Sequence, residues 1–135
     1  MKQAHKVRMA ECSCGQVSII CRGEPIRTAI CHCFACQRRT GSVFGVQARF
    51  TREQVSYSGE LTEYTRISDT GNQVHYSFCP SCGTTVILTL SLYPEFTIIP
   101  VGIFTSQDLP QPSFSVYEQH KHSWVKFDCQ VEQIP

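Results

Sequence analysis

The stretch Cys31-His32-Cys33-Phe34-Ala35-Cys36 places three thiols within six residues. Three thiolates this close together can bind one metal ion, and zinc is the usual occupant of an all-sulfur site. Zinc binds four ligands in tetrahedral geometry, so three cysteines leave one coordination position open. The stretch therefore predicts a metal centre whose fourth position is available for chemistry.

Two more cysteine pairs flank this triplet in the sequence, Cys12/Cys14 and Cys79/Cys82. Together they offer the four sulfurs of a closed structural zinc site. The second cysteine of each pair precedes a glycine, which can adopt a positive φ and turn backbone N–H groups toward a thiolate. A second arrangement also has acceptable spacing. The last two cysteines of the triplet can join the later pair in a CxxC…CxxC zinc ribbon, although this separates Cys31 from its neighbours.

The number of cysteines, nine in 135 residues, requires either disulfide bonds or metal binding as an explanation. The count is odd, and the basic residues at the N-terminus are not followed by the apolar run of a secretory signal. Cysteines two residues apart are poorly placed to bond to each other but well placed to chelate a metal. We therefore expect a cytoplasmic protein whose cysteines bind metal.

Composition argues against two classes of partner. The chain has 12 Lys and Arg against 11 Asp and Glu, a net charge of +1, so no bulk charge attracts nucleic acid. No segment approaches the about 20 consecutive apolar residues that span a bilayer. We expect neither a nucleic-acid nor a membrane partner.

Short runs of branched and aromatic residues, separated by turn residues, dominate the chain, and no stretch keeps a 3.6-residue apolar period. This pattern predicts a single all-β domain. Strands are predicted at 17–21, 43–50, 61–67, 73–78, 85–90 and 96–104, with a hairpin loop at 69–72 and a helical turn at 106–109. We expect residues 1–11 to be a loose N-terminal segment, 12–127 to form the zinc domain, and 128–135 to be a C-terminal tail.

The order of these motifs resembles the glutathione-dependent formaldehyde-activating enzyme family, which includes centromere protein V. The resemblance covers roughly residues 12–127 and rests on CxCG, CHCxxC followed by Gly41-Ser42, Phe78 to Thr84, Val101-Gly102 and Ser123-Trp124. It implies a β-tent fold of short antiparallel strands curled around two zinc sites. The implied ligands are Cys12, Cys14, Cys79 and Cys82 for a structural zinc, and Cys31, Cys33 and Cys36 for a second zinc. The chain departs from the family pattern at Ser115, where many members place a histidine.

An open three-cysteine zinc is better suited to holding a thiol than to activating water. Three thiolates weaken the ion as a Lewis acid, whereas coordination makes a substrate thiol available as thiolate near neutral pH. Together with the resemblance, this predicts a carbon–sulfur lyase of the S-(hydroxymethyl)glutathione synthase type. Its substrates would be a glutathione-like thiol and formaldehyde or another small aldehyde, and its cofactors two Zn²⁺ ions per chain, one structural and one catalytic.

Three further residues near the triplet are candidates for this chemistry. Arg38 and Arg39 have the side chains that bind carboxylates bidentately, although solvated surface arginines or compensation of thiolate charge also explain them. His32 stands between two ligands and could move a proton or simply support the metal site.

Two other functions stay open. The first is a noncatalytic zinc-binding interaction module in which both metals are structural, and a fourth protein ligand at the triplet would favour it. The second is a thiol redox protein that uses Cys33 and Cys36. An open coordination position that faces a pocket would favour the enzyme.

Overall fold

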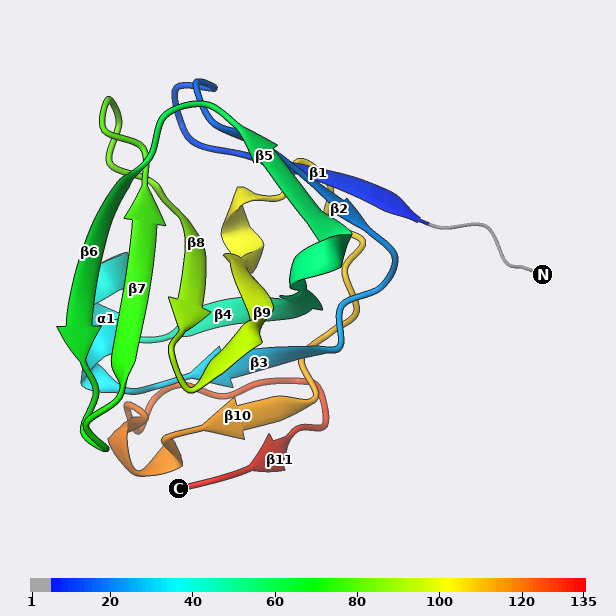
Figure 1. The fold of residues 1–135 in the computed structure, drawn as a ribbon. Coiled ribbons are helices and arrows are strands. Elements are labelled where there is room, and N and C mark those ends of the chain that lie inside the picture. The colour runs from blue at the N-terminus through cyan, green and yellow to red at the C-terminus, as the bar shows by residue number, and fades with distance from the viewer. Residues whose placement is uncertain (1–5) are drawn as a thin grey trace.

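The computed structural model describes residues 6–135, which form eleven strands, one α-helix and three short 3₁₀ helices (Figure 1). The strands are β1 (Val7–Glu11), β2 (Ser18–Arg22), β3 (Arg27–Cys31), β4 (Gly45–Thr51), β5 (Val55–Ser58), β6 (Thr62–Ile67), β7 (Gln73–Phe78), β8 (Thr85–Leu90), β9 (Tyr93–Pro100), β10 (Phe114–Val116) and β11 (Glu132–Gln133). The helices are α1 (Phe34–Thr40), η1 (Arg52–Gln54), η2 (Val101–Ile103) and η3 (Glu118–His120). The domain is all-β, as the sequence predicts.

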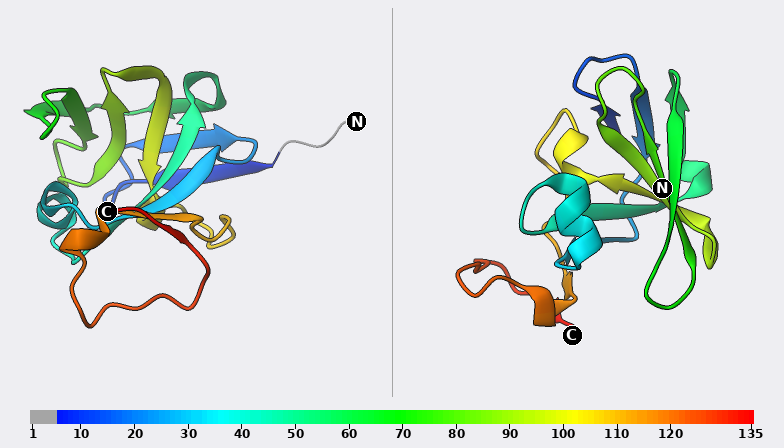
Figure 2. Two further views of the ribbon diagram at one scale, coloured as in Figure 1. Left: turned by 90° about the horizontal axis from the view of Figure 1, so that it is seen from below. Right: turned by 90° about the vertical axis from the view of Figure 1, so that its left-hand side faces the viewer.

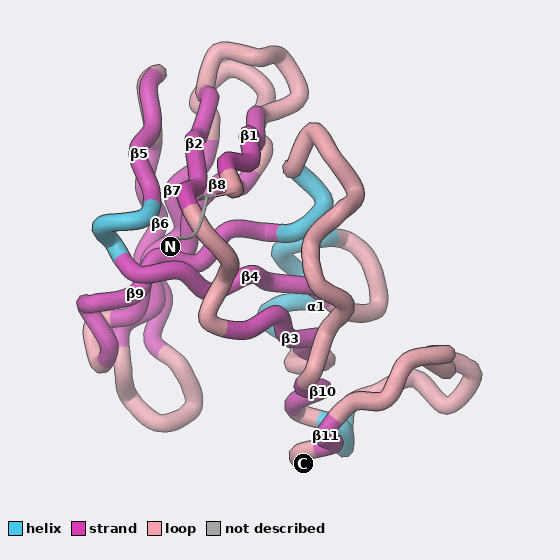
Figure 3. The backbone as a smooth tube through the Cα atoms, turned by 90° about the vertical axis from the view of Figure 1, so that its right-hand side faces the viewer, coloured by secondary structure: helices cyan, strands magenta, loops and turns pink. Residues whose placement is uncertain are grey.

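The strands form two sheets, one of three strands in the order β1-β2-β5 and one of eight in the order β11-β10-β3-β4-β9-β8-β7-β6. The pairs are antiparallel except that β10 runs parallel to both β3 and β11. β10 and β11 extend the large sheet beyond β3, away from the three-stranded sheet (Figure 3). Between η3 and β11 the chain runs out in a wide loop before it returns to the sheet edge (Figure 2).

The core lies between the two sheets and reaches the outer cysteine pairs. Phe50 of β4, Ile19 of β2 and Ile99 of β9 are completely buried in it. Cys12 and Cys79 belong to the same cluster of buried residues. Burying a side chain such as Phe or Ile stabilises a fold by about 1.5–3 kcal/mol. Because Cys12 and Cys79 belong to the same cluster, the core and the outer cysteine pairs stabilise the same part of the molecule.

All six predicted strands are present. The strands at 73–78 and 85–90 have the predicted ends, and the ends of the other four are shifted. The largest shift is in the last one, where the strand covers Tyr93–Pro100 and residues 101–103 form η2. The C-terminal region contributes β10 and β11, and β11 lies within residues 128–135, which were expected to be a tail. The two elements that carry the cysteine triplet, β3 and α1, were not predicted, and neither were β1, β5, β10, β11 and the three 3₁₀ helices.

The prediction of a loose N-terminal segment is wrong for residues 7–11, and residues 1–5 lie outside the described part. β1 pairs with β2 from Val7 opposite Arg22 to Glu11 opposite Ser18. Arg8 and Ala10 point inward and are buried, which gives the strand one buried face. A charged residue at an inward position hides the apolar alternation by which strands are recognised in a sequence.

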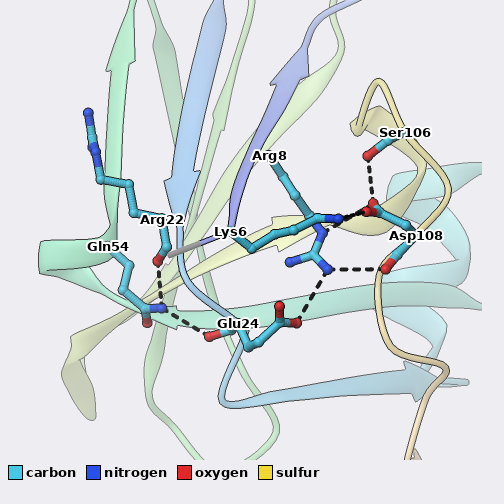
Figure 4. A network of polar contacts seen from close by, with 7 residues as sticks. All are labelled: Lys6, Arg8, Arg22, Glu24, Gln54, Ser106 and Asp108. Atoms are coloured by element: carbon cyan, nitrogen blue, oxygen red, sulfur yellow. Dashed lines mark hydrogen bonds and ion pairs between the residues drawn. The ribbon is translucent and has the colours of Figure 1, made fainter. Parts of the chain in front are cut away.

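The buried Arg8 is held by acidic side chains from two other segments (Figure 4). Its Nε donates to Asp108 Oδ1 over 3.2 Å and its Nη2 to Glu24 Oε1 over 3.3 Å, while Lys6 Nζ lies 2.5 Å from Asp108 Oδ2. Ser106 Oγ donates to the same carboxylate. The predicted helical turn at 106–109 is therefore wrong, because these residues form bends that present Asp108 to β1.

Within residues 6–135, no helix has the length and apolar character needed to cross a membrane.

Candidate metal centres

The two outer cysteine pairs come together in one cluster. The Sγ atoms of Cys12, Cys14, Cys79 and Cys82 all lie within 4.8 Å of one another. Two of the separations, Cys12 to Cys14 and Cys14 to Cys79, are 3.7 Å. Zinc–sulfur bonds of about 2.3 Å in a tetrahedron place sulfurs about 3.8 Å apart, so the donor set and its spacing fit zinc. We call these four residues the closed cluster.

Two similar turns build the closed cluster. The N–H of Gly15 donates to the carbonyl of Cys12 over 3.1 Å, and the N–H of Gly83 donates to the carbonyl of Cys79 over 2.8 Å. Both glycines have a positive φ, 80° and 81°, which side chains rarely adopt. The conformation expected from the two Cys-Gly pairs is therefore present, and it folds each chain segment around its sulfurs.

Hydrogen bonds to the sulfurs stabilise the charge of the closed cluster. Donors come from Val17 N–H to Cys12 Sγ at 3.2 Å, Gln16 Nε2 to Cys79 Sγ at 3.2 Å and Ser81 N–H to Cys79 Sγ at 3.4 Å. The hydroxyl of Thr84 lies 3.3 Å from Cys82 Sγ, and hydrogen bonding to it lowers the pKa of Cys82 to about 5. This cysteine is thus a thiolate at neutral pH, the form that binds metal.

The triplet forms a second cluster, with the Sγ atoms of Cys31, Cys33 and Cys36 within 4.8 Å of one another. Cys31 ends β3, Cys33 is the N-cap of α1, and Cys36 lies in the first turn of that helix. The N–H of Cys36 donates to Cys33 Sγ over 3.3 Å, and Gln47 Nε2 donates to Cys36 Sγ over 3.3 Å. A strand end followed at once by a helix start therefore gathers the three sulfurs. We call them the open cluster.

No fourth His, Cys, Asp or Glu of residues 6–135 joins the open cluster. The zinc-ribbon alternative is wrong, because Cys33 and Cys36 lie in a different cluster from Cys79 and Cys82. The three sulfurs fit the expected zinc with three protein ligands, the form in which zinc keeps a position for water or substrate.

The three thiols differ in charge and in access. Side-chain hydrogen bonds from Cys31 and Cys36 lower the pKa of Cys33 most strongly, and the positive charge of Arg66 lowers it further. Cys31 and Cys36 are only 7% and 5% exposed, whereas Cys33 is half-buried. Negative charge in the open cluster is therefore favoured at the sulfur that is most accessible.

Cys33 lines a small polar cavity of about 270 Å³, which we call the Cys33 cavity. Its wall comes from three places in the sequence: the start of α1, the β6–β7 hairpin, and the segment around η3, which meet at the lower left of Figure 1. The lining residues are Cys33, Phe34, Ala35, Arg38, Arg66, Ser68, Asp69, Tyr117 and His120. The open coordination position of a metal ion bound to the open cluster, on the side of Cys33, would thus face the small polar Cys33 cavity.

The two candidate arginines lie on different sides of the open cluster. Arg38 is exposed and lines the Cys33 cavity. Arg39 lines a larger apolar cavity of about 760 Å³ instead. A Cβ on Gly45 would come 2.9 Å from Arg39 Nη2 and 3.6 Å from Cys36 Cβ, so this glycine makes room for the guanidinium beside the ligand. The hydrogen bond with Cys31 lowers the pKa of Cys36, but the hydrogen bond with Cys33, burial and the negative charge of Cys33 raise it overall. The positive charge of Arg39 lowers the pKa of Cys36.

His32 is completely buried and does not line the Cys33 cavity. Its Nε2 lies 2.9 Å from Ser115 Oγ, and Ser115 donates to Glu118 Oε2. The imidazole packs against Phe44 and Phe127, with ring centres 5.9 Å and 5.8 Å away. This environment favours a supporting role, in which His32 ties the ligand loop to the C-terminal segment through Ser115.

Among the residues of the Cys33 cavity that sequence reasoning missed are Arg66 and Tyr117. Arg66 belongs to β6, and its Nε donates to the hydroxyl of Tyr76 over 2.7 Å. Tyr117 follows β10 directly. Neither carries a local sequence signal, because each reaches the cavity only through the pairing of distant strands.

Comparison with known proteins agrees with this arrangement. The family model described as "Glutathione-dependent formaldehyde-activating enzyme" matches residues 7–120. Three solved chains match, among them the crystal structure of a Rhodobacter sphaeroides protein from structural genomics, with a TM-score of 0.59 and 22% identity over 74% of this chain and 90% of that chain. That likeness concerns the fold alone. A search of curated proteins finds no match. The match to the family model spans most of the sequence, and the chain therefore belongs to the glutathione-dependent formaldehyde-activating enzyme family.

Proposed function

We propose that the protein is a zinc-dependent carbon–sulfur lyase that adds a glutathione-like thiol to formaldehyde or another small aldehyde, reversibly. One observation carries the proposal: the open cluster has three sulfurs, no fourth ligand from residues 6–135, and one accessible sulfur on a polar cavity. Family membership supports the same chemistry. The β-tent description and the cytoplasmic location belong to this proposal too, the latter because thiols stay reduced in that compartment.

Two zinc ions per chain have separate tasks in this proposal. Cys12, Cys14, Cys79 and Cys82 would hold the structural ion, and Cys31, Cys33 and Cys36 the catalytic one. When bound at the open cluster, zinc supplies a positive charge that keeps a substrate thiol deprotonated near neutral pH. The remaining tasks, binding and orienting the substrates, belong to side chains of the chain itself.

The cations of the Cys33 cavity suit a thiol that carries carboxylates. Arg38 and Arg66 both line it, and neither forms an ion pair with a carboxylate in the described part of the chain. A guanidinium binds a carboxylate with two parallel hydrogen bonds. Asp69 lines the same cavity and offers a counter-charge for an ammonium group. Arg39 is better explained as compensation for thiolate charge at Cys36.

The noncatalytic module is the second candidate function. It requires the open cluster to be closed by a fourth protein ligand, and residues 6–135 offer none within reach. The cavity beside Cys33 likewise has no purpose in a purely structural site. The enzyme is therefore the better-supported proposal.

The test is an assay of the zinc-loaded protein with glutathione and formaldehyde, after subtraction of the uncatalysed reaction. Cys36→Ser removes a ligand of the open cluster, so its rate is expected to fall to the uncatalysed background. Cys129→Ser is the matched control, because Cys129 is half-buried and lies outside both clusters. Equal rates for wild type and Cys36→Ser would show that the open cluster takes no part in the reaction.

A further inference from the structure

We propose that Tyr117 is a catalytic residue, whose hydroxyl donates a hydrogen bond and then a proton to the aldehyde oxygen in the Cys33 cavity. This role rests on the proposed function, because it needs a thiol and an aldehyde at the open cluster. Tyr117 and Cys33 line the same cavity, although they lie far apart in the sequence.

The backbone holds Tyr117 in an unusual conformation. Among residues 6–135 it is the one non-glycine residue with a positive φ, 57°. Such a conformation persists only where the surroundings impose it, and it occurs preferentially at functional sites. Both neighbours are fixed. Val116 pairs with Cys31 and accepts a hydrogen bond from His32 N–H over 3.1 Å, and Glu118 N–H donates to the Ile134 carbonyl over 3.0 Å. The position of the ring is thus tied to the ligand-bearing strand β3.

The hydroxyl of Tyr117 is available as a donor. It makes no hydrogen bond with any side chain or backbone group of residues 6–135. Burial raises the pKa of Tyr117, and the negative charges of Cys33 and Cys31 raise it further. The phenol therefore stays protonated at neutral pH.

Stacking restricts the ring as well. His120 lies parallel to Tyr117, with ring centres 6.3 Å apart and an angle of 11° between the planes. His120 also packs against Phe34, with ring centres 4.1 Å apart. The three rings form one wall of the Cys33 cavity. A catalytic donor needs a fixed position, because a displacement of even 1 Å is costly for catalysis.

The other polar groups of the cavity are less suited to protonating an oxygen. Arg38 and Arg66 remain charged and match carboxylates instead. The Ser68 hydroxyl is engaged within its own hairpin, with Thr70 Oγ1 at 3.0 Å and Asn72 N–H at 3.2 Å. Asp69 is an acceptor when ionised. His120 is the competing donor, and a variant of it belongs in the test.

The reaction step balances with Tyr117 as acid. The sulfur of the substrate thiolate attacks the carbonyl carbon and forms the C–S bond. The electron pair of the C=O π bond moves to oxygen, which takes the proton of the Tyr117 hydroxyl and becomes the hydroxyl of the product. Water then returns a proton to Tyr117, equivalent to the one that the thiol released on binding. The reverse reaction uses the same groups in the opposite order.

The experiment compares wild type with Tyr117→Phe, which removes the hydroxyl and keeps the ring. We expect kcat to fall about 100-fold, the lower end of the range for general acid catalysis, while the KM for the thiol stays unchanged. Tyr57→Phe is the matched control, because Tyr57 is 54% exposed on β5, outside the cavity. His120→Gln is measured beside them and is expected to lose less activity than Tyr117→Phe.

A second measurement separates catalysis from binding and from folding. Cobalt replaces zinc, and glutathione is titrated against the absorption band of cobalt–thiolate bonds. Wild type and Tyr117→Phe are expected to bind glutathione with the same midpoint. An unchanged kcat in Tyr117→Phe, a shifted binding midpoint that accounts for its whole loss, or a larger loss in His120→Gln would each overturn the role. Wild type that binds glutathione but gives no turnover would overturn the proposed function, and this role with it.

Discussion

Gln16 links the closed cluster to the turn that follows β5. Its Nε2 donates to Cys79 Sγ and to the Glu60 carbonyl, each over 3.2 Å, while its Oε1 accepts from Glu60 N–H. The turn can approach this closely only because residue 59 is glycine. A Cβ at Gly59 would lie 2.4 Å from the Gln16 carbonyl oxygen and 2.9 Å from Val17 Cα. A residue without a side chain therefore helps to place a hydrogen-bond donor on Cys79 of the closed cluster.

Gly59→Ala is expected to destabilise the zinc-loaded protein by more than about 2 kcal/mol, since the clash with backbone adds to the about 1–2 kcal/mol cost of a positive φ. Gly71→Ala is the matched control. Its φ is +86° but nothing lies within 4 Å of the added Cβ, so only the cost of the backbone conformation is expected. Urea unfolding measures the free energy of unfolding of both variants. Equal losses of this free energy would contradict a steric clash at residue 59.

At the scale of residues, the sequence predicts the ligands better than their surroundings. Cys-x-Cys-Gly and Cys-Pro-Ser-Cys-Gly are local patterns, and the structure places their sulfurs in one cluster. The spacing of the cysteines alone did not exclude the zinc ribbon. Cys79 and Cys82 can share a metal ion with either earlier group of cysteines, and only the arrangement of the strands shows which group lies beside them. Tyr117 had no signal at all, since its conformation is imposed by the pairing of β10 with β3.

At the scale of elements, strand β1 buries a charged side chain, Arg8, where an apolar side chain would be expected, and ion pairs compensate its charge. Arg8 is 5% exposed and faces two carboxylates, Asp108 and Glu24 (Figure 4). Lys6, and to a smaller extent Ser106 and Arg8, hold the pKa of Asp108 well below its usual range. The network joins the first strand to the loop after η2 and to the turn after β2.

Asp108→Asn is therefore expected to lower the melting temperature near pH 7. The lowered pKa means that the carboxylate stabilises the fold above the pKa of an unfolded aspartate, about 4, and loses this effect as pH falls toward the folded value. The difference in melting temperature between wild type and Asp108→Asn should consequently become smaller below about pH 4. Thermal unfolding from pH 7 to pH 2 measures it, with the exposed Asp128→Asn as control. A difference in melting temperature that does not change with pH would contradict the stabilising role of the ionised Asp108 carboxylate.

Helix α1 and strand β3 were missed because each is short, with seven and five residues. The helix has seven residues with Cys36 as the one buried among them. Its cap is a cysteine of the open cluster, Cys33, instead of the usual serine or aspartate. Helix-capping residues and apolar periodicity therefore do not predict this helix. The long hairpin of β6 and β7, in contrast, was predicted from the alternation of its residues and from its Asp-Thr-Gly-Asn loop.

For the whole molecule, the two clusters have different positions in the fold. The closed cluster joins the turn between β1 and β2 to the turn between β7 and β8, and so connects the small sheet to the large one. Structural zinc supplies on the order of 10 kcal/mol of apparent folding free energy. The open cluster lies within one short segment, residues 31–36, and connects no distant parts of the chain. The fold should therefore depend on the first metal and the chemistry on the second.

The most direct test of this division is metal content per chain, measured by elemental analysis together with circular dichroism. Wild type is expected to contain about two zinc ions, one for each cluster. The triple variant Cys31→Ser/Cys33→Ser/Cys36→Ser is expected to contain about one and to keep its β-sheet spectrum. One zinc ion in both proteins, or an unfolded triple variant, would contradict a separate open metal centre.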